Sequence, residues 1–233
     1  MKLAILYSGG KDSNYALYEA SRKHKIKCLI SIKSKNPYSY MFQTNGINLI
    51  KHQSLALNIP LIEFETIGKK EEELKDLKKA IKLAIQKYSI EGIVTGAINS
   101  IYQSSRIQKI CKELNIWCFN PLWQKDQVEF LKDIIKNNFE VIIVSIASYP
   151  LNKNYLGRKL NNELLDELIQ MQKKYKINPA GEGGEIETFV INSPLFNYKI
   201  KIINSNIEED SENSAELIIN EVKLIKKNES INN

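Results

Sequence analysis

The apolar residues of the chain form short runs and helical repeats that alternate from its start. Runs such as Leu3–Tyr7 predict strands, because a parallel strand that is covered on both faces is apolar throughout. Repeats at three- and four-residue spacing predict helices with one buried face. The predicted strands are Leu3–Tyr7, Ile26–Ile32, Leu61–Phe64, Gly92–Thr95, Ile116–Phe119 and Val141–Ile146, and the predicted helices are Asp12–Lys23, Asn45–Asn58, Lys69–Tyr88, Ser100–Leu114 and Asp126–Asn137.

This alternation predicts parallel βαβ units, and the pattern changes after about Ser148. There a helix, a glycine- and glutamate-rich loop and several strand-like runs follow one another: Leu160–Lys174, Gly181–Glu187, Phe189–Asn192, Lys199–Ile203 and Glu216–Ile225. We therefore predict an α/β protein. A Rossmann-like, doubly wound parallel sheet would occupy residues 1–146 and bind a nucleotide, and a smaller α+β domain would occupy residues 147–233 and bind the substrate.

Composition narrows the class of protein. The chain has 233 residues, of which 43% are hydrophobic and 26% are charged, and no apolar run is long enough to span a membrane. Because its N-terminus also lacks the pattern of a signal peptide, we expect a cytoplasmic protein without a membrane partner. The three cysteines form no CxxC pair and only two histidines are present, which weighs against a zinc site. The net charge of +6 comes from lysines dispersed over helix faces, so no nucleic-acid partner is expected.

The string Ser8-Gly-Gly-Lys-Asp-Ser13 lies between the first predicted strand and the first predicted helix. Ligands of parallel sheets bind beyond the carboxyl ends of the strands, where the next helix presents unpaired N–H groups. Gly9 and Gly10 allow close approach of the backbone, Lys11 adds a positive charge, and the two serines add hydroxyl groups. The string therefore predicts a phosphate-binding loop.

Two familiar phosphate loops do not match this string. A Walker A loop would need glycine where Ile5 stands and Ser or Thr where Asp12 stands, and the dinucleotide motif GxGxxG is absent. The string instead resembles the pyrophosphate loop of the adenine-nucleotide α-hydrolase-like, or PP-loop, ATP pyrophosphatases. That resemblance implies cleavage of ATP to AMP and pyrophosphate, usually through an adenylated substrate.

Further motifs narrow the resemblance. They are Gly92–Ile107 (GIVTGAINSIYQSSRI), Leu156-Gly157-Arg158, Asn178–Val190 (NPAGEGGEIETFV) and Ser193-Pro-Leu-Phe196. Together with the glycine loop they resemble the diphthine–ammonia ligase family, in its short archaeal-type form, from residue 1 to about residue 200. The resemblance implies ATP-dependent amidation of diphthine on translation elongation factor 2. Ammonium would be the second substrate, and diphthamide, AMP and pyrophosphate the products, by way of an acyl-adenylate.

The resemblance also implies roles for particular residues. Nucleotide binding is expected of Ser8, Gly9, Gly10, Lys11, Asp12, Ser13, Thr95, Gly96 and Ala97, with Asp12 also helping to place Mg²⁺. Catalysis is expected of Lys11, Arg106, Glu182 and Glu185, and substrate binding of Tyr102, Gln103, Gly183, Gly184, Glu187 and Thr188. Glu182 and Glu185 are expected to face the positively charged substrates, whereas Glu187 is expected to be structural.

Some points depart from the family pattern or stay open. Ile186 stands where the family usually has tyrosine, and Asn192 where aspartate is expected. A tRNA-modifying PP-loop enzyme is one alternative, although Cys111 in a predicted helix and Cys118 on a predicted strand do not suggest sulfur transfer. A nucleotide-binding protein without catalytic activity is another, but it would have no need of the loop Gly181–Thr188. The sequence leaves the oligomeric state open, a homodimer included.

Overall fold

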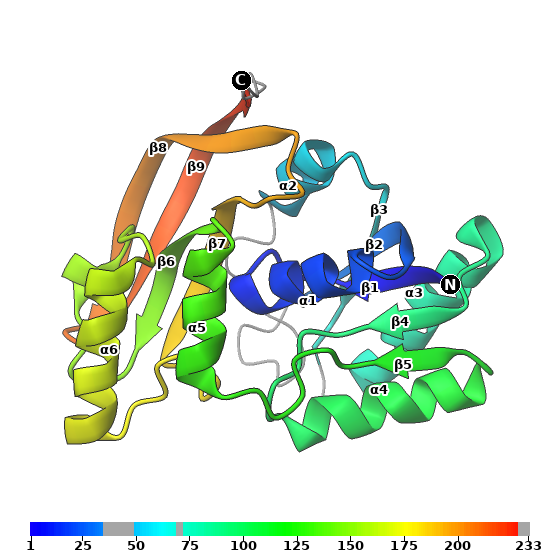
Figure 1. Ribbon diagram of the computed structural model, residues 1–233, viewed down its shortest axis with the longest axis horizontal. Coiled ribbons are helices and arrows are strands. Elements are labelled where there is room, and N and C mark those ends of the chain that lie inside the picture. Colours follow the sequence, from blue (N-terminus) through cyan, green and yellow to red (C-terminus); the bar gives the residue numbers. More distant parts are fainter. Residues whose placement is uncertain (35–48, 69–71, 228–233) are drawn as a thin grey trace.

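The computed structural model describes residues 1–34, 49–68 and 72–227, which form two sheets (Figure 1). The first sheet is parallel, in the order β3-β2-β1-β4-β5, and the second is antiparallel, in the order β7-β6-β9-β8. The strands are β1 Lys2–Leu6, β2 Lys25–Ser34, β3 Leu61–Thr66, β4 Gly92–Val94, β5 Trp117–Phe119, β6 Glu140–Ala147, β7 Ile186–Asn192, β8 Tyr198–Ser211 and β9 Ser214–Lys226. The helices are α1 Lys11–Ser21, α2 Ile50–Leu57, α3 Glu72–Tyr88, α4 Ile101–Glu113, α5 Gln127–Lys136 and α6 Asn162–Tyr175, with a short 3₁₀ helix at Lys153–Tyr155.

The predicted doubly wound sheet is confirmed, with β1 at its centre between β2 and β4. Leu3 and Ile5 pack on the face that α1 covers, and Ala4 packs on the face that α3 and α4 cover. The chain runs outward from β1 in one direction through β2 and β3, and in the other through β4 and β5. Ligands of such sheets bind at this change of direction, and the loops after β1 and β4 both lie there.

One predicted strand belongs to the other sheet. Val141–Ile146 was expected to extend the parallel sheet, but β6 pairs antiparallel with β7 and β9. A fully buried strand has the same apolar pattern in either sheet, so periodicity could not reveal its partners. Helix α5 also lies beside α6 rather than on the first sheet (Figure 1). The chain therefore leaves the first sheet after β5, ahead of residue 146.

The last two strands are longer than their apolar runs predicted. Strands β8 and β9 pair from Tyr198 opposite Lys226 to Ser211 opposite Ser214, and much of β8 is exposed and polar. The prediction ended each strand with its apolar residues, but the cross-strand hydrogen bonds continue between the polar residues beyond them. The starts expected for two helices, at residues 45 and 69, lie outside the described residues.

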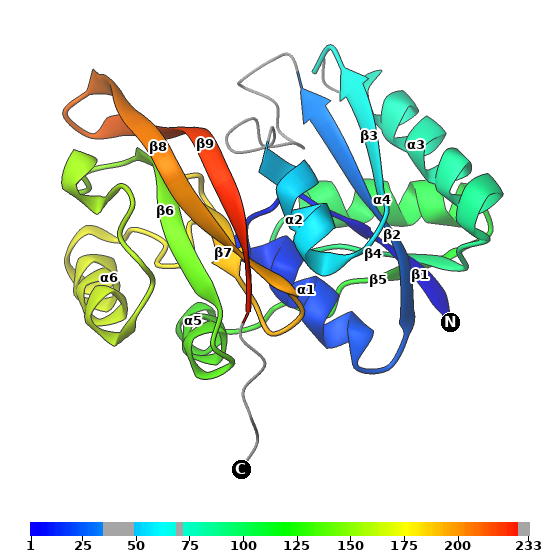
Figure 2. The same cartoon turned by 90° about the horizontal axis from the view of Figure 1, so that it is seen from above.

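The second sheet places one edge strand against the phosphate loop. Strand β7 lies beside α1 in both views (Figures 1 and 2), and the core residues of the α1 face form one cluster with those of the second sheet. Within the described ranges, every helix is too short or too polar to span a membrane.

Candidate active site

The loop after β1 leads into the N-terminus of α1, where the first turn has no side-chain cap. Gly10 is the N-cap residue of α1 and, as a glycine, offers no side chain to cap the first turn. Gly9 has φ +85°, a conformation that favours glycine. The unpaired N–H groups of a helix start carry a partial positive charge and attract phosphate oxygens.

The loop after β4 packs directly on this phosphate loop. A Cβ atom on Gly96 would lie 2.8 Å from the backbone carbon of Asp12 and 2.9 Å from the nitrogen of Ser13. The hydroxyl of Thr95 donates to Asn120 Oδ1 (2.6 Å) and accepts from the N–H of Ala97 (3.3 Å). The structure thus brings these three predicted nucleotide-binding residues to α1, where Gly96 has no room for a side chain.

Polar side chains of the loop after β1 and of the first turns of α1 form hydrogen bonds with the backbone of that loop. Ser13 Oγ donates to the carbonyl of Gly10 (3.2 Å) and accepts from the backbone N–H of Ser8 (3.3 Å). Asn14 Nδ2 donates to the carbonyl oxygens of Gly9 and Gly10 (3.1 and 3.0 Å), and Tyr7 donates to Asn14 Oδ1 (2.7 Å). These contacts fix the backbone of the loop before any ligand binds.

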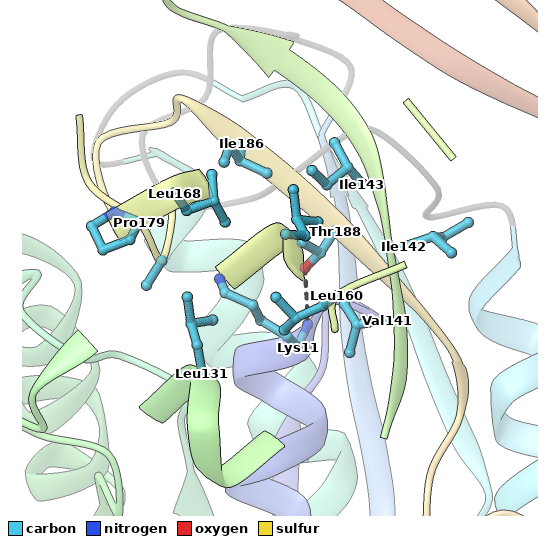
Figure 3. Close-up of a pocket in the computed structure, with 12 residues that line it drawn as sticks. Lys11, Leu131, Val141, Ile142, Ile143, Leu160, Leu168, Pro179, Ile186 and Thr188 are labelled. Carbon is cyan, nitrogen blue, oxygen red and sulfur yellow. Dashed lines mark hydrogen bonds between the residues drawn. The ribbon is translucent and has the colours of Figure 1, made fainter. Parts of the chain in front are cut away.

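The side chain of Lys11 is enclosed by apolar groups. It is 5% exposed, and Figure 3 shows it in a pocket lined by residues of α5, α6, β6 and β7. The space left beside the lysine has a volume of about 20 Å³, room for about one water molecule. Lys11 Nζ donates to Asp12 Oδ2 (3.1 Å). A cation with such poor solvation gains from an added phosphate oxygen.

The glycine- and glutamate-rich loop is closed by one of its own carboxylates. Glu185 Oε1 accepts from the N–H of Asn178 (3.1 Å), and Oε2 accepts from the N–H of Gly183 (2.9 Å). Gly181 and Gly184 have φ +73° and +86°, and Gly183 and Gly184 are exposed at the turn. Glu185 therefore holds the loop, a part that the sequence analysis assigned to Glu187.

Glu182 connects the glycine- and glutamate-rich loop to the segment that follows β4. Its Oε2 accepts from the N–H of Asn99 (3.3 Å) in the segment after β4. Burial and the nearby Asp12 carboxylate raise the pKa of the Glu182 carboxyl, against a smaller lowering effect of Lys11. The hydrogen bond from Asn99 holds Glu182 against the segment after β4, and Gly96 of that segment packs on the start of α1.

Strand β7 carries Glu187 and Thr188, and it lies next to the start of α1. Glu187 lies opposite Ser145 of β6, and the hydroxyl of Thr188 accepts from the backbone N–H of Lys11 at 3.1 Å (Figure 3). Thr188, which was expected to bind substrate, thus contacts the helix start that was expected to bind phosphate.

The remaining predicted residues lie on α4. Ser100 caps the helix by accepting from the N–H of Gln103 (3.3 Å). The Arg106 guanidinium carbon lies 3.5 Å from the centroid of the Tyr102 ring, and Nη1 donates to the Tyr102 carbonyl (3.4 Å). These contacts hold Arg106 against the first turn of its own helix, next to the loop that carries Gly96.

The two departures from the family pattern fit their surroundings. Ile186 is buried in the apolar pocket beside Lys11. Asn192 Nδ2 donates to Glu140 Oε1 (3.0 Å), where an aspartate would place a second carboxylate. Burial favours a raised pKa at Glu140, but hydrogen bonds from Lys199, Lys159 and Asn192 outweigh it and lower the pKa to about 2.

The Leu156-Gly157-Arg158 motif contacts strand β6 of the second sheet and helix α6. Arg158 makes a two-pronged ion pair with Glu167 of α6, at 2.8 and 2.6 Å. Gly157 has φ +77°, and its N–H donates to the carbonyl of Ile143 on β6 (2.8 Å). The motif therefore ties α6 to β6 and is structural.

Sequence reasoning missed Gln53. This side chain is 0% exposed and its Nε2 donates to the carbonyl oxygens of Gly9 (2.9 Å) and Val190 (2.7 Å). One signal could have revealed it, because Gln53 lies at helical spacing between Ile50 and Leu57, on the face of α2 that is otherwise apolar. A polar residue at such a position needs a buried partner.

Comparison with known proteins identifies the family of this chain. The family model for the diphthamide synthase N-terminal domain matches residues 1–117, and that for the C-terminal domain matches residues 126–227. A diphthine–ammonia ligase of Bos taurus is 34% identical over 89% of this chain and 85% of its own length, and one of Rattus norvegicus is 36% identical over 87% and 83%. The chain belongs to the diphthine–ammonia ligase family.

Solved structures that match at low sequence identity include a protein from an archaeon. The predicted subunit of a tRNA methyltransferase from Methanocaldococcus jannaschii aligns with 83% of this chain and 98% of its own, at a TM-score of 0.46 and 18% identity.

Proposed function

We propose that this protein amidates diphthine on translation elongation factor 2, using ATP and ammonium and releasing AMP and pyrophosphate. The observation that carries the proposal is the hydrogen bond from the N–H of Asn99 to Glu182 Oε2 (3.3 Å), because it holds this carboxylate against the segment after β4 that packs on the start of α1. This contact supports a role for the carboxylate in binding ammonium next to the proposed nucleotide site. The family to which the chain belongs supplies the choice of substrate.

The first step would be activation of the diphthine carboxylate. A carboxylate oxygen attacks the α phosphorus of ATP, so that an acyl–phosphate bond forms and pyrophosphate leaves. The helix start at Gly10 and the buried Lys11 would hold the β and γ phosphates and stabilise the charge that develops on the leaving group. Backbone groups at Thr95–Ala97, packed on α1, would border the α phosphate.

Mg²⁺ fits the same loop if the phosphates supply most of its ligands. Among the described residues, no group of three or more His, Cys, Asp or Glu side chains is gathered to hold a metal ion. Asp12 is 26% exposed and pairs with Lys11, so it could offer one carboxylate once Lys11 turns to a phosphate. Mg²⁺ accepts such a site, because it commonly binds one or two carboxylates and several phosphate or water oxygens, and it would neutralise phosphate charge.

The second step would join ammonia to the activated acyl carbon. Only neutral ammonia is nucleophilic, so ammonium must lose a proton as the carbon–nitrogen bond forms and AMP leaves. Glu182 is proposed to bind the cation and accept that proton, and its raised pKa would make it a better base than an exposed carboxylate. Glu185, by contrast, acts through the shape of the loop. Arg106, which lies on the neighbouring helix α4, is proposed to balance charge on the adenylate.

The two sheets suggest which part of the chain binds the nucleotide and which part binds the protein substrate. We place the boundary between the nucleotide-binding and substrate-binding parts after β5, because α5 and β6 belong with the second sheet. The two parts share one hydrophobic cluster and meet along β7, so the substrate-binding loop and the phosphate loop are held in a fixed relation.

Pyrophosphate release tests the proposal. The purified protein is mixed with ATP, ammonium and elongation factor 2 that bears diphthine, and in parallel with factor that lacks the modification. Release that needs both ammonium and diphthine, with amidation seen by mass spectrometry, is the expected result. Release with tRNA, but not with the modified factor, would contradict the choice of substrate.

A further inference from the structure

The carbonyl oxygen of Gly9 receives three hydrogen bonds from three parts of the chain. The donors are the backbone N–H of Val190 on β7 (3.1 Å), Gln53 Nε2 on α2 (2.9 Å) and Asn14 Nδ2 on α1 (3.1 Å). A carbonyl oxygen has two lone pairs, so three donors saturate it. The orientation of the Gly9–Gly10 peptide is therefore held by more contacts than a turn needs.

This orientation decides what the loop presents to a phosphate. In a planar trans peptide the carbonyl and the following N–H point in opposite directions. With the Gly9 carbonyl turned toward α2 and β7, the N–H of Gly10 is turned away from them, on the side of the α1 start. A glycine at φ +85° resists rotation of its peptide less than other residues do. A rotated peptide would present an oxygen to the phosphate and repel it.

Gln53 is the donor that is best placed to prevent this rotation. Its amide bridges the carbonyl oxygens of Gly9 and Val190, so it fastens the loop to β7 with both N–H groups. Asn14 belongs to α1 and would move together with the loop, whereas Gln53 lies 44 residues away on another helix. Its Oε1 also lies 2.7 Å from the position of a Cβ atom on Gly9, so the loop and Gln53 fit only when residue 9 is glycine.

The geometry points to Gln53 as a positioning residue for ATP: it sets the Gly9–Gly10 peptide so that the Gly10 N–H faces the phosphates. The inference rests on the proposed use of ATP. It concerns binding rather than the chemical step, because Gln53 is fully buried and acts through the loop.

Two variants separate hydrogen bonding from packing. Gln53→Met keeps the length of the side chain but removes its donors, and Gln53→Glu places an oxygen opposite two carbonyl oxygens. Each is expected to raise the Kd for ATP about tenfold or more, which corresponds to one or two lost hydrogen bonds. The matched control is Ser54→Ala on the same helix, where Ser54 Oγ donates only to the Ile59 carbonyl (2.7 Å). Its Kd for ATP should stay within twofold of wild type.

The measurements are calorimetric titration with ATP and steady-state kinetics at saturating protein substrate. A positioning role raises the KM for ATP and changes kcat less than threefold, whereas general loss of structure lowers kcat and leaves KM unchanged. Equal ATP affinity in Gln53→Met and wild type would contradict this inference alone. A wild-type protein that does not bind ATP would contradict the proposed function as well.

A measurement on the unaltered protein covers the case in which the variants do not fold. The amide proton of Gly10 should shift strongly in the ¹H–¹⁵N spectrum when ATP is added, because it forms a hydrogen bond to a phosphate. A Gly10 resonance that stays in place while the amides of the α1 start shift would overturn the inference.

Discussion

The hydroxyl of Thr188 accepts a hydrogen bond from the backbone N–H of Lys11 at 3.1 Å, across 177 positions of the chain. Thr188 ends the glycine- and glutamate-rich motif, and Lys11 begins the helix of the phosphate loop. The hydroxyl proton of Thr188 is left for another acceptor, such as a phosphate oxygen. The glycine- and glutamate-rich motif is therefore joined directly to the loop that is proposed to bind the nucleotide.

This contact predicts that Thr188→Val weakens the start of α1, whereas Thr188→Ser does not. Loss of the hydroxyl leaves the N–H of Lys11 without its acceptor, which should lower the free energy of unfolding by about 1 kcal/mol. Urea unfolding followed by circular dichroism measures the effect. Equal stability of the Val and Ser variants would show that the hydrogen bond does not matter.

Glu182→Gln should separate amidation from nucleotide binding. The variant keeps the shape of the side chain but cannot accept the proton of ammonium, so amidation should fall roughly 100-fold or more. The Kd for ATP should change little or decrease, because one negative charge near the phosphates is removed. Amidation measured by mass spectrometry and ATP titration give the two quantities.

Glu185→Gln is the matched comparison for that experiment. One oxygen of Glu185 remains able to accept from Asn178 or Gly183, and the other position becomes a donor that opposes an N–H. We expect a less stable loop and a smaller loss of amidation than in Glu182→Gln. A larger loss in Glu185→Gln would reverse the roles of the two glutamates.

Gly96→Ala should disturb the packing of two loops. The added methyl group would lie 2.8 Å from the backbone of Asp12, so the loops must separate, at a cost of about 1–3 kcal/mol. ATP affinity should fall as well, because the displaced backbone borders the proposed phosphate site. Gly184→Ala is the control: nothing lies within 4 Å of its added methyl group, and only the φ of +86° opposes it. Thermal unfolding and ATP titration of both variants test this.

Glu140 predicts a loss of stability in acid. Its pKa in the folded protein is about 2, below the ordinary value of 4.5, so its contribution is full above pH 4.5. As pH falls from about 4.5 to about 2, the carboxylate takes up a proton and that contribution is lost. The free energy of unfolding should therefore fall more steeply over this range in wild type than in Glu140→Gln. Parallel slopes for the two proteins would contradict the assignment.

The first half of the fold could be predicted because its signals are local. An apolar run such as Leu3–Ile5, followed by two glycines and a helical repeat, contains the strand, the turn and the helix within one short segment. The glutamate-rich motif was equally visible, and its resemblance to the diphthine–ammonia ligase family predicted a role in substrate binding. Such features depend on backbone conformation and on neighbours in the sequence.

The sheet to which β6 belongs could not be predicted in the same way. Val141, Ile143 and Val144 have the pattern of any buried strand, and only the partners β7 and β9 show that the sheet is antiparallel. The extent of β8 and β9 was likewise hidden, because their hydrogen bonds join backbone atoms beneath polar side chains.

The sequence by itself determined the parallel sheet, the glycine turn between β1 and α1, and the family to which the chain is similar. Only the tertiary structure decided which carboxylate contacts the segment after β4, which one closes its own turn, and that Gln53 holds the Gly9 carbonyl. The reason is physical. Identical side chains such as Glu182 and Glu185 differ in their hydrogen-bond partners, and those partners, Asn99, Asn178 and Gly183, are brought together by the fold.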